Sequence, residues 1–377
     1  MSRARSAAVA AVAIATTAGL AVAGCSAAQP ARSAGPAAAP PPIGLATAVA
    51  GGSGAAWATL PVPGPAGTTT AYWQLLVRPA GRAVWRLATP PGVADNAGLV
   101  VAGPPGGSLT VAFVPADLLT FTPLAVTGDG GAHWSQGLLP ERLAGRPDAL
   151  STLPAGALIA VTARAAEVSG PSGARWRPLV TEAALAASPA GRACGLRSLT
   201  AAAAPGGVPL LAGDCARPGR VGLFRRVGPG WALADIALPA ALRTARVTVL
   251  RLLATNGGAA ALIAVAGPAG TVLLAATSGS GSGWTAGPPI AVGHMAARFA
   301  SAGPGGQWGV ALANSRAVLI GPRTARYLPG RLPGTDATVV PGSPVSALVP
   351  GTGTVSVWEL SGGGWRRRQT VGIPTGV

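Results

Sequence analysis

Lysine is absent from the sequence, so all 28 basic residues are arginine, and the only histidines are His133 and His294. A phosphate-binding loop of the Walker type requires a lysine, so the sequence has no such loop. The histidines lie far apart, and neither a His-x-x-x-His nor a Cys-x-x-Cys spacing occurs. A Gly-x-Ser-x-Gly nucleophile elbow is also missing. We therefore expect no metal and no cofactor.

Acidic residues are scarce as well, with 11 in 377 residues. Glycoside hydrolysis uses a pair of carboxylates. The acids here are mostly isolated, close to expected turns or strand ends, and no neighbouring pair stands out. A pair drawn from different parts of the fold stays open, but the sequence predicts no catalytic residue. We expect a protein that is not an enzyme.

The formal net charge is +17, and the arginines are spread along the chain. Their tightest run is Arg366–Arg368. Nucleic-acid-binding proteins usually concentrate basic charge on one face, so we expect no nucleic-acid partner. The favoured interpretation is a soluble basic surface, and attraction to anionic lipid or envelope polymers is the alternative.

Glycine and proline are abundant, at 56 and 37 residues, which in some chains indicates disorder. The hydrophobic fraction is 49%, and Val/Leu/Ala runs of strand length lie between the Gly/Pro clusters. Disordered chains lack this apolar content. The composition therefore predicts a packed, turn-rich, all-β fold.

The amino terminus has the pattern of an export signal. Arg3 and Arg5 precede an apolar run from Ala7 to Ala23, and small residues then lead to Cys25. The ending Val-Ala-Gly-Cys resembles the lipobox of bacterial lipoproteins. That resemblance implies a signal peptide over residues 1–24, a diacylglycerol on Cys25, and attachment to the outer face of the cell membrane. An uncleaved helical anchor is the alternative. Residues 25–43 (CSAAQPARSAGPAAAPPPI) predict an Ala/Pro-rich tether.

Two further cysteines, Cys194 and Cys215, flank two apolar runs joined by a Pro-Gly-Gly turn at 205–207. If the segment is a β-hairpin, the cysteines face each other across the strand ends. An exported protein reaches a compartment where disulfides persist. We therefore predict a structural disulfide between them, in preference to a redox or metal pair.

A strand–turn–aromatic unit recurs along residues 44–377. Its aromatic residues recur at a mean spacing of about 47 residues, within the range of propeller blades. They are Trp85, Trp134, Trp176, Trp231, Trp284, Tyr327 and Trp365. Between them lie hairpins with nearly uninterrupted apolar strands, such as LTAAAAPGGVPLLAGDC and FASAGPGGQWGVALANS, as expected for inner strands buried on both faces.

Two hairpins per period predict a single β-propeller with seven four-stranded blades, each continuous in sequence. The expected blades are 44–95, 96–142, 143–186, 187–240, 241–292, 293–335 and 336–377. A pair of stacked β-sandwiches is the rival architecture. The segments 181–187 (TEAALAA) and 239–245 have local helical preference, but helix preference is a weak prior that strand pairing overrides.

Residues Thr127–Trp134 read TGDGGAHW and match the pattern Ser/Thr-x-Asp-x-Gly-x-x-Trp. The match resembles the Asp-box (BNR) repeat of sialidase-like propellers, through Thr127, Asp129, Gly131 and Trp134. The resemblance implies a structural turn between the third and fourth strands of a blade, away from any active site. His133 is expected at the surface rather than as a ligand.

A sialidase also needs an arginine cluster, a tyrosine nucleophile with a glutamate partner, and an acidic acid/base. The only tyrosines, Tyr72 and Tyr327, have no acidic neighbour in sequence. Four tryptophans lie outside the repeated position: Trp57, Trp73, Trp308 and Trp358. Trp308 follows a predicted turn and is a candidate for exposure, although a tryptophan in an apolar strand is usually core.

The sequence therefore predicts an exported, lipid-anchored, monomeric β-propeller that acts as a non-catalytic binding or scaffolding module at the cell envelope. Its expected partners are the membrane, through the anchor, and an envelope polymer, a peptide or a protein. A glycan-active hydrolase of sialidase-like architecture is the alternative.

Overall fold

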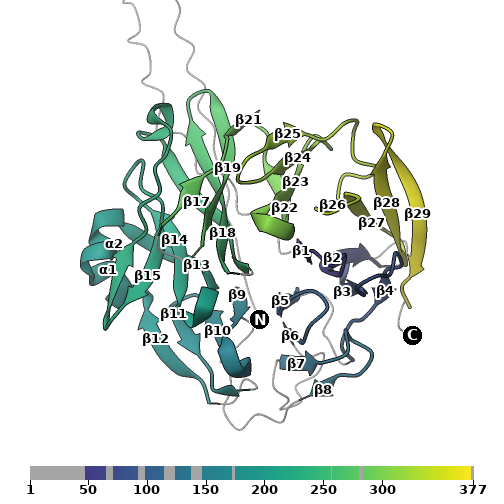
Figure 1. The fold of residues 1–377 in the computed structure, drawn as a ribbon, viewed down its shortest axis with the longest axis horizontal. Coiled ribbons are helices and arrows are strands. Elements are labelled where there is room, and N and C mark those ends of the chain that lie inside the picture. The colour runs from purple at the N-terminus through teal and green to yellow at the C-terminus, as the bar shows by residue number, and fades with distance from the viewer. Residues whose placement is uncertain are drawn as a thin grey trace, which may run out of the picture. The chain divides into compact units, whose positions relative to one another are not determined.

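The fold is built from seven four-stranded antiparallel meanders, each made of strands that are consecutive in sequence (Figure 1). The computed structural model describes residues 47–64, 71–91, 98–113, 124–136, 147–171, 175–255, 257–279 and 283–374. The predicted signal peptide, Cys25 and the tether lie outside these residues. None of the described helices has the length and apolar character needed to cross a membrane.

The strands are numbered in chain order, four to a meander, with one extra strand in the fifth. Meander 1 comprises β1 (Thr47–Ala50), β2 (Ala56–Pro63), β3 (Ala71–Arg78) and β4 (Arg86–Leu87). Meander 2 comprises β5 (Val100–Ala102), β6 (Leu109–Ala112), β7 (Leu124–Thr127) and β8 (Ser135–Gln136). Meander 3 comprises β9 (Ala149–Thr152), β10 (Leu158–Val161), β11 (Ala165–Val168) and β12 (Arg177–Thr181). Meander 4 comprises β13 (Leu196–Ala203), β14 (Leu210–Cys215), β15 (Leu223–Val227) and β16 (Gly230–Leu233).

The remaining strands follow the same scheme. Meander 5 comprises β17 (Arg246–Thr255), β18 (Gly258–Gly267), β19 (Gly270–Ser278) and β20 (Thr285–Ala286), with β21 (Ile290–Gly293) also paired to β19. Meander 6 comprises β22 (Ala297–Ala302), β23 (Trp308–Leu312), β24 (Ala317–Ile320) and β25 (Ala325–Tyr327). Meander 7 comprises β26 (Thr338–Val340), β27 (Ser346–Gly351), β28 (Thr354–Ser361) and β29 (Gly364–Gly372).

The meanders follow one another around a ring in a β-propeller arrangement. The first strands β5, β9, β13 and β17 contact one another in that order, as do β22, β26 and β1, and β19 contacts β24 between the two groups. Meander 7 also contacts meander 1 through β27 and β2. The first and last meanders each keep their own four strands, so among the described residues no strand is exchanged between the chain ends.

The expectation of seven separate blades is corrected by one pairing. Five meanders are separate blades, whereas meanders 1 and 6 share an eight-stranded sheet because β1 pairs in parallel with β22 at Val49 and Ala302. Two side chains extend the contact. Thr47 Oγ1 donates to Ala300 O at 2.7 Å, and Ala48 N donates to Ser301 Oγ at 2.9 Å. The inner edge of β1 thereby finds hydrogen-bond partners that a buried strand edge requires.

The second strand of most meanders is buried on both faces, as its uninterrupted apolar sequence predicts. The strands β6, β10 and β23 are buried at every residue, and β18 at all but its last. Enclosing one Leu, Val or Ile side chain contributes about 1.5–3 kcal/mol, so these strands supply much of the driving force for folding.

Three turns between first and second strands share one backbone conformation. They are short 3-10 turns at Pro154–Gly156, Pro205–Gly207 and Pro304–Gly306, each with a middle residue at positive φ. The last glycine lies against the preceding meander: a Cβ on Gly207 would lie 3.1 Å from Pro154 Cγ, and one on Gly306 would lie 2.6 Å from Thr277 Cγ2. Glycine therefore permits the close approach of neighbouring turns.

The repeated aromatic residues mark the outermost strands. Each lies within the fourth strand of a meander or directly before it, at Trp85, Trp134, Trp176, Trp231, Trp284, Tyr327 and Trp365. The outer hairpin was thus located correctly in every period.

Two short helices form where strand pairing was expected to prevail. Helix α1 (Glu182–Ala187) and helix α2 (Pro189–Cys194) connect β12 to β13. Thr181 Oγ1 accepts a hydrogen bond from Ala184 N, and Ser188 Oγ accepts one from Gly191 N. Each N-cap hydrogen bond satisfies a backbone N–H at the start of its helix that would otherwise need a partner on a neighbouring strand. The local helical preference therefore prevails over strand pairing in this segment. In the second segment, Ala240–Leu242 forms one 3-10 turn.

Candidate functional site

A cavity of about 720 Å³ lies between the first strands of the meanders. Its wall comes from six of them, β1, β5, β9, β13, β17 and β22, with the turns that follow β1, β5 and β22. Pockets of this size accommodate small organic ligands, and propellers offer such space at their axis.

The seventh first strand, β26, does not line the cavity. It lies against β1, β22 and β23, and a Cβ on Gly309 of β23 would lie 2.9 Å from Val339 Cγ1. The parallel pairing of β1 with β22 therefore closes the wall in front of β26. The same pairing that joins two meanders into one sheet also shapes the cavity.

Two β-bulges face the cavity from neighbouring strands. In β13 the partners are Leu199–Gly213 and Ala201–Ala212, which leaves Thr200 as the extra residue. In β17 the partners are Val249–Ile263 and Arg251–Leu262, which leaves Leu250 as the extra residue. A bulge bends its strand and re-aims the side chains beside it. Thr200 and Arg251 both line the cavity as a result.

Arg251 is the only basic side chain of the described wall. It is half-buried, and burial lowers the pKa of its guanidinium to about 10. That value keeps the group protonated at neutral pH. Its Nη1 donates to Leu250 O at 3.5 Å, and a guanidinium offers five N–H donors in a planar fork. The sequence contained one signal for this residue, an arginine within the apolar run VTVLRLLAT.

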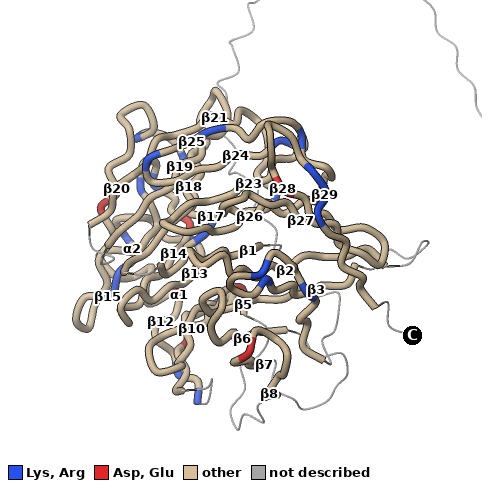
Figure 2. The backbone as a smooth tube through the Cα atoms, turned by 45° about the vertical axis from the view of Figure 1, so that its right-hand side comes forward, with Lys and Arg blue, Asp and Glu red and all other residues tan. Residues whose placement is uncertain are grey.

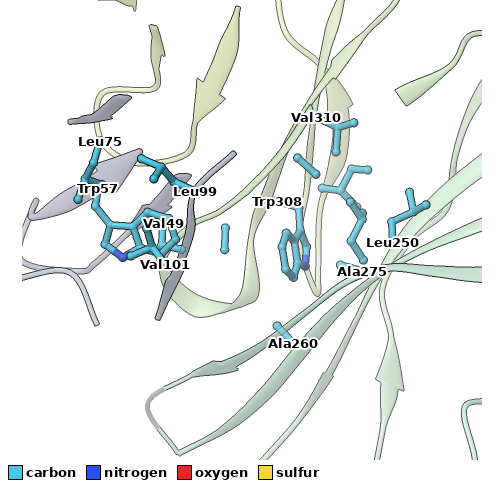
Figure 3. Packing of buried hydrophobic residues seen from close by; sticks show 14 of the residues in the cluster. Val49, Trp57, Leu75, Leu99, Val101, Leu250, Ala260, Ala275, Trp308 and Val310 are labelled. Carbon is cyan, nitrogen blue, oxygen red and sulfur yellow. The ribbon is translucent and has the colours of Figure 1, made fainter. Parts of the chain in front are cut away.

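Two indoles border the cavity, and both belong to the buried hydrophobic cluster drawn in Figure 3. Trp57 of β2 and Trp308 of β23 are 3% and 2% exposed, so the suggested exposure of Trp308 is wrong and its assignment to the core is correct. Trp57 Nε1 donates to Gly103 O at 3.1 Å, a bond between meanders 1 and 2 that fixes the orientation of its ring.

The described wall contains one carboxylate, Asp148, which is exposed and directly precedes β9. Thr200 Oγ1 is enclosed and makes no hydrogen bond with the described residues. No group of three or more His, Cys, Asp or Glu side chains that could hold a metal ion occurs within the described ranges. Asp148, Thr200 and Arg251 were not singled out from the sequence, because only the assembled strands bring them together.

The TGDGGAHW motif lies in the turn between β7 and β8 and contributes no residue to the cavity wall. Asp129 Oδ1 accepts from Thr127 Oγ1 at 2.8 Å, from Ala132 N at 2.9 Å and from His133 N at 3.0 Å. Thr127 Oγ1 in turn accepts from Gly131 N at 2.8 Å. The motif therefore closes its own turn, as its spacing predicts.

Electrostatics reinforce this turn. The hydrogen bond from His133 N, followed by the His133 ring and Thr127, holds the pKa of Asp129 well below its usual range. His133 is 91% exposed, and its Nδ1 lies 2.7 Å from Asp129 Oδ2, which agrees with its predicted surface position.

The turn is also attached to meander 1. Arg86 Nη2 donates to Asp129 O and Gly130 O, both at 3.1 Å, and a Cβ on Gly131 would lie 2.5 Å from Ala88 Cβ. Trp134 is partly buried and packs against the hydrophobic cluster that meander 1 shares with its neighbours. The turn thus holds meander 2 against the preceding meander.

The predicted disulfide between Cys194 and Cys215 is present. The hairpin explanation needs correction, because Cys194 ends helix α2 and the strand partner of Cys215 is Leu196. The bond therefore ties α2 to the end of β14. Both cysteines are buried in the cluster that holds Leu185 and Phe224, so the bond is part of the core. Cys25, the predicted lipidation site, lies outside the described residues.

The arginines are distributed over several meanders, as the sequence suggests (Figure 2). Arg366–Arg368 are exposed on β29, where Arg368 Nε lies 3.0 Å from Glu359 Oε2. Arginines also lie over aromatic rings: Arg226 lies 5.4 Å from the centroid of the Trp231 ring, and Arg316 lies 4.1 Å from that of Tyr327. Part of the basic surface therefore packs on the outer aromatic residues.

Comparison with known proteins gives structural similarity alone. No protein-family model matches the sequence, and no curated protein sequence matches it. YCF48 from Cyanidioschyzon merolae is 15% identical with a TM-score of 0.45, covering 85% of this chain and 94% of that one. The β-propeller arrangement of this chain follows from its own strand order and contacts.

Two bacterial structures show a similar degree of likeness. The extracellular domain of the putative one component system BT4673 from B. thetaiotaomicron is 8% identical, with a TM-score of 0.45, covering 84% of this chain and 37% of that one. PorZ, a surface component of the type-IX secretion system of Porphyromonas gingivalis, is 12% identical, with a TM-score of 0.43, covering 81% and 44%. All three structures are β-propeller proteins, and the likeness concerns the fold.

Proposed function

We propose that this chain is a non-catalytic binding module of the cell envelope, and that the cavity between its first strands is the binding site. The observation that carries the proposal is the cavity itself, about 720 Å³ in volume, walled by six first strands and two indoles. A large, mostly apolar pocket with a few convergent polar groups is the usual form of a ligand site.

The composition of the wall favours binding over hydrolysis. A glycan-active hydrolase of this architecture would gather two or three carboxylates around the axis. Among the described wall residues Asp148 is the single carboxylate, and it is exposed to solvent. The hydrolase remains the second candidate only through the turn at Thr127–Trp134, which resembles an Asp-box and lies outside the cavity.

We further propose that the chain is exported and held at the membrane through a lipid on Cys25, with residues 44–377 as the propeller. The lipobox-like sequence before Cys25 supports the anchor, and the buried disulfide between Cys194 and Cys215 is typical of proteins outside the cytoplasm. The Cys25→Ala variant should lose acylation and leave the membrane fraction, measured by mass spectrometry and fractionation. Membrane retention without lipid on the unaltered chain would favour an uncleaved anchor.

Binding in the cavity can be tested by filling it. The purified full chain is screened on a glycan array and a peptide library, beside the Ala254→Trp variant, in which an indole replaces a methyl group at the cavity wall. Ala291→Trp is the matched control, because Ala291 is exposed on β21 and outside the wall. Ligands should be lost with Ala254→Trp and kept with Ala291→Trp. Retention by both variants would place binding elsewhere, and cleavage of a bound glycan would show an enzyme.

A further inference from the structure

The wall of the central cavity points to the class of ligand. We infer that it binds a small apolar molecule with a single carboxylate, and that Arg251 holds the carboxylate. The inference rests on the proposed binding function, and the observations that carry it are the size and chemistry of the wall and the placement of its charges.

The volume and the wall set the size and polarity of the ligand. A cavity of about 720 Å³ lies within the range of sites for drug-sized molecules. Most of the wall is alanine, valine, leucine, proline and glycine, contributed by residues such as Val49, Val101, Leu252 and Ala302. A strongly hydrated ligand would lose hydrogen bonds to water that this apolar surface cannot replace. Burial of an apolar ligand in the cavity is favourable in free energy.

The charged side chains of the wall indicate the charge of the ligand's polar group. Arg251 lies within β17, half-buried, whereas Asp148 is exposed at the beginning of β9. A charge at reduced solvent access interacts more strongly with a ligand than one in open water, so the arginine dominates. A planar guanidinium binds a carboxylate through two parallel hydrogen bonds.

Two indoles border the apolar wall. Trp57 and Trp308 are only 3% and 2% exposed, so they add apolar edges to the wall and present no open ring face. The bond from Trp57 Nε1 to Gly103 O fixes the position of one of these edges.

The test uses four probes of defined charge on the full chain: 2-naphthoate, its neutral amide 2-naphthamide, 2-naphthylmethylammonium and octanoate. Binding is measured by isothermal titration calorimetry. We expect 2-naphthoate to bind at least tenfold more tightly than the amide, and octanoate, an apolar carboxylate without a ring, to bind as well. Arg251→Met should weaken 2-naphthoate binding roughly tenfold to a hundredfold, as loss of a charged hydrogen bond does, and leave the amide unchanged.

Arg246→Met is the matched control, because Arg246 begins the same strand and lies outside the cavity wall. It should leave all four affinities unchanged, and circular dichroism and unfolding midpoints verify that both variants are folded. Equal binding of acid and amide, or an unchanged 2-naphthoate affinity in Arg251→Met, would overturn the role of Arg251. Octanoate binding that Arg251→Met leaves unchanged would overturn it as well.

The outcomes also separate this inference from the proposed function. Binding of the amide or the ammonium probe as tightly as 2-naphthoate, lost in Ala254→Trp and with every affinity unchanged in Arg251→Met, would retain the cavity as a site and reject the carboxylate. The same conclusion would follow if all four probes failed to bind at millimolar concentration while the array gave ligands whose binding is lost in Ala254→Trp. Failure of the probes and of the array would reject both.

Discussion

Trp85 and Gln369 form a reciprocal pair across 284 residues of sequence, and this pair joins the first meander to the last. Trp85 N donates to Gln369 Oε1 at 2.9 Å, and Gln369 Nε2 donates to Trp85 O at 2.7 Å. The Trp85 ring is buried, with the Arg78 guanidinium 5.2 Å from its centroid. Burial lowers the pKa of Arg78, and the charge of Glu359 on meander 7 acts in the opposite direction.

Gln369→Leu should destabilise the fold by about 1–3 kcal/mol, because it leaves the backbone N–H and C=O of the buried Trp85 without their partner. Gln369→Glu keeps an acceptor and loses the donor, so we expect an intermediate effect. The measurement is chemical unfolding followed by tryptophan fluorescence. Thr370→Leu on the exposed side of the same strand is the control. Equal midpoints for Gln369→Leu and Thr370→Leu would show that the pair contributes nothing to ring closure.

The sequence predicted features that depend on neighbours in the chain. The local signals in the sequence are apolar runs, Pro-Gly-Gly turns and outer aromatic residues such as Trp134 and Trp365. The runs form inner strands, the turns join them, and the aromatic residues mark the fourth strands, as predicted. The turn chemistry of Asp129 was predicted for the same reason, since its partners lie within four residues.

Features that depend on assembly were missed. The pairing of Val49 with Ala302 joins strands about 250 residues apart, and no local pattern specifies it. The cavity position of Arg251 depends on a bulge whose register is set by β18. Cys194 was predicted to lie on a strand because Cys194 and Cys215 are about equally far in sequence from the turn at 205–207. Instead, the N-cap at Ser188 begins helix α2, and this helix ends at Cys194.

Removal of the disulfide should cost about 3 kcal/mol, as expected for a loop of 21 residues whose closure restricts the unfolded chain. The comparison is between the original chain and the Cys194→Ala/Cys215→Ala double variant, by urea unfolding. Because both sulfurs are buried, dithiothreitol should leave the folded protein oxidised and act only near the unfolding midpoint. Rapid reduction under native conditions would contradict the position of this bond in the core.

Asp129 should make stability depend on pH in the acidic range. Its pKa is lowered in the folded state, chiefly by the amide of His133 and then by the His133 and Thr127 side chains. The stabilisation is therefore complete above the unfolded pKa, about 3.9, and is lost as pH falls below that value toward the folded pKa. Asp129→Asn should be less stable at pH 6 and show a shallower decline from pH 4 to pH 2.5, measured by thermal unfolding. The exposed Asp235→Asn is the control, and parallel curves for all three proteins would contradict the prediction.

Ala155 adopts φ 59 and ψ 23, whereas glycine occupies the equivalent turn positions, with φ 58 at Gly206 and φ 65 at Gly305. A side chain at this conformation costs about 1–2 kcal/mol, and glycine relieves the strain but gains about 0.4–1 kcal/mol of freedom in the unfolded chain. Ala155→Gly should therefore be neutral or slightly stabilising. Gly206→Ala has open space around its new methyl group, so its expected loss of about 1 kcal/mol comes from the backbone alone. Thermal unfolding of the two single variants tests whether their changes in stability have opposite signs. A loss of stability in Ala155→Gly would show that packing of the Ala155 methyl group contributes more than the backbone strain costs.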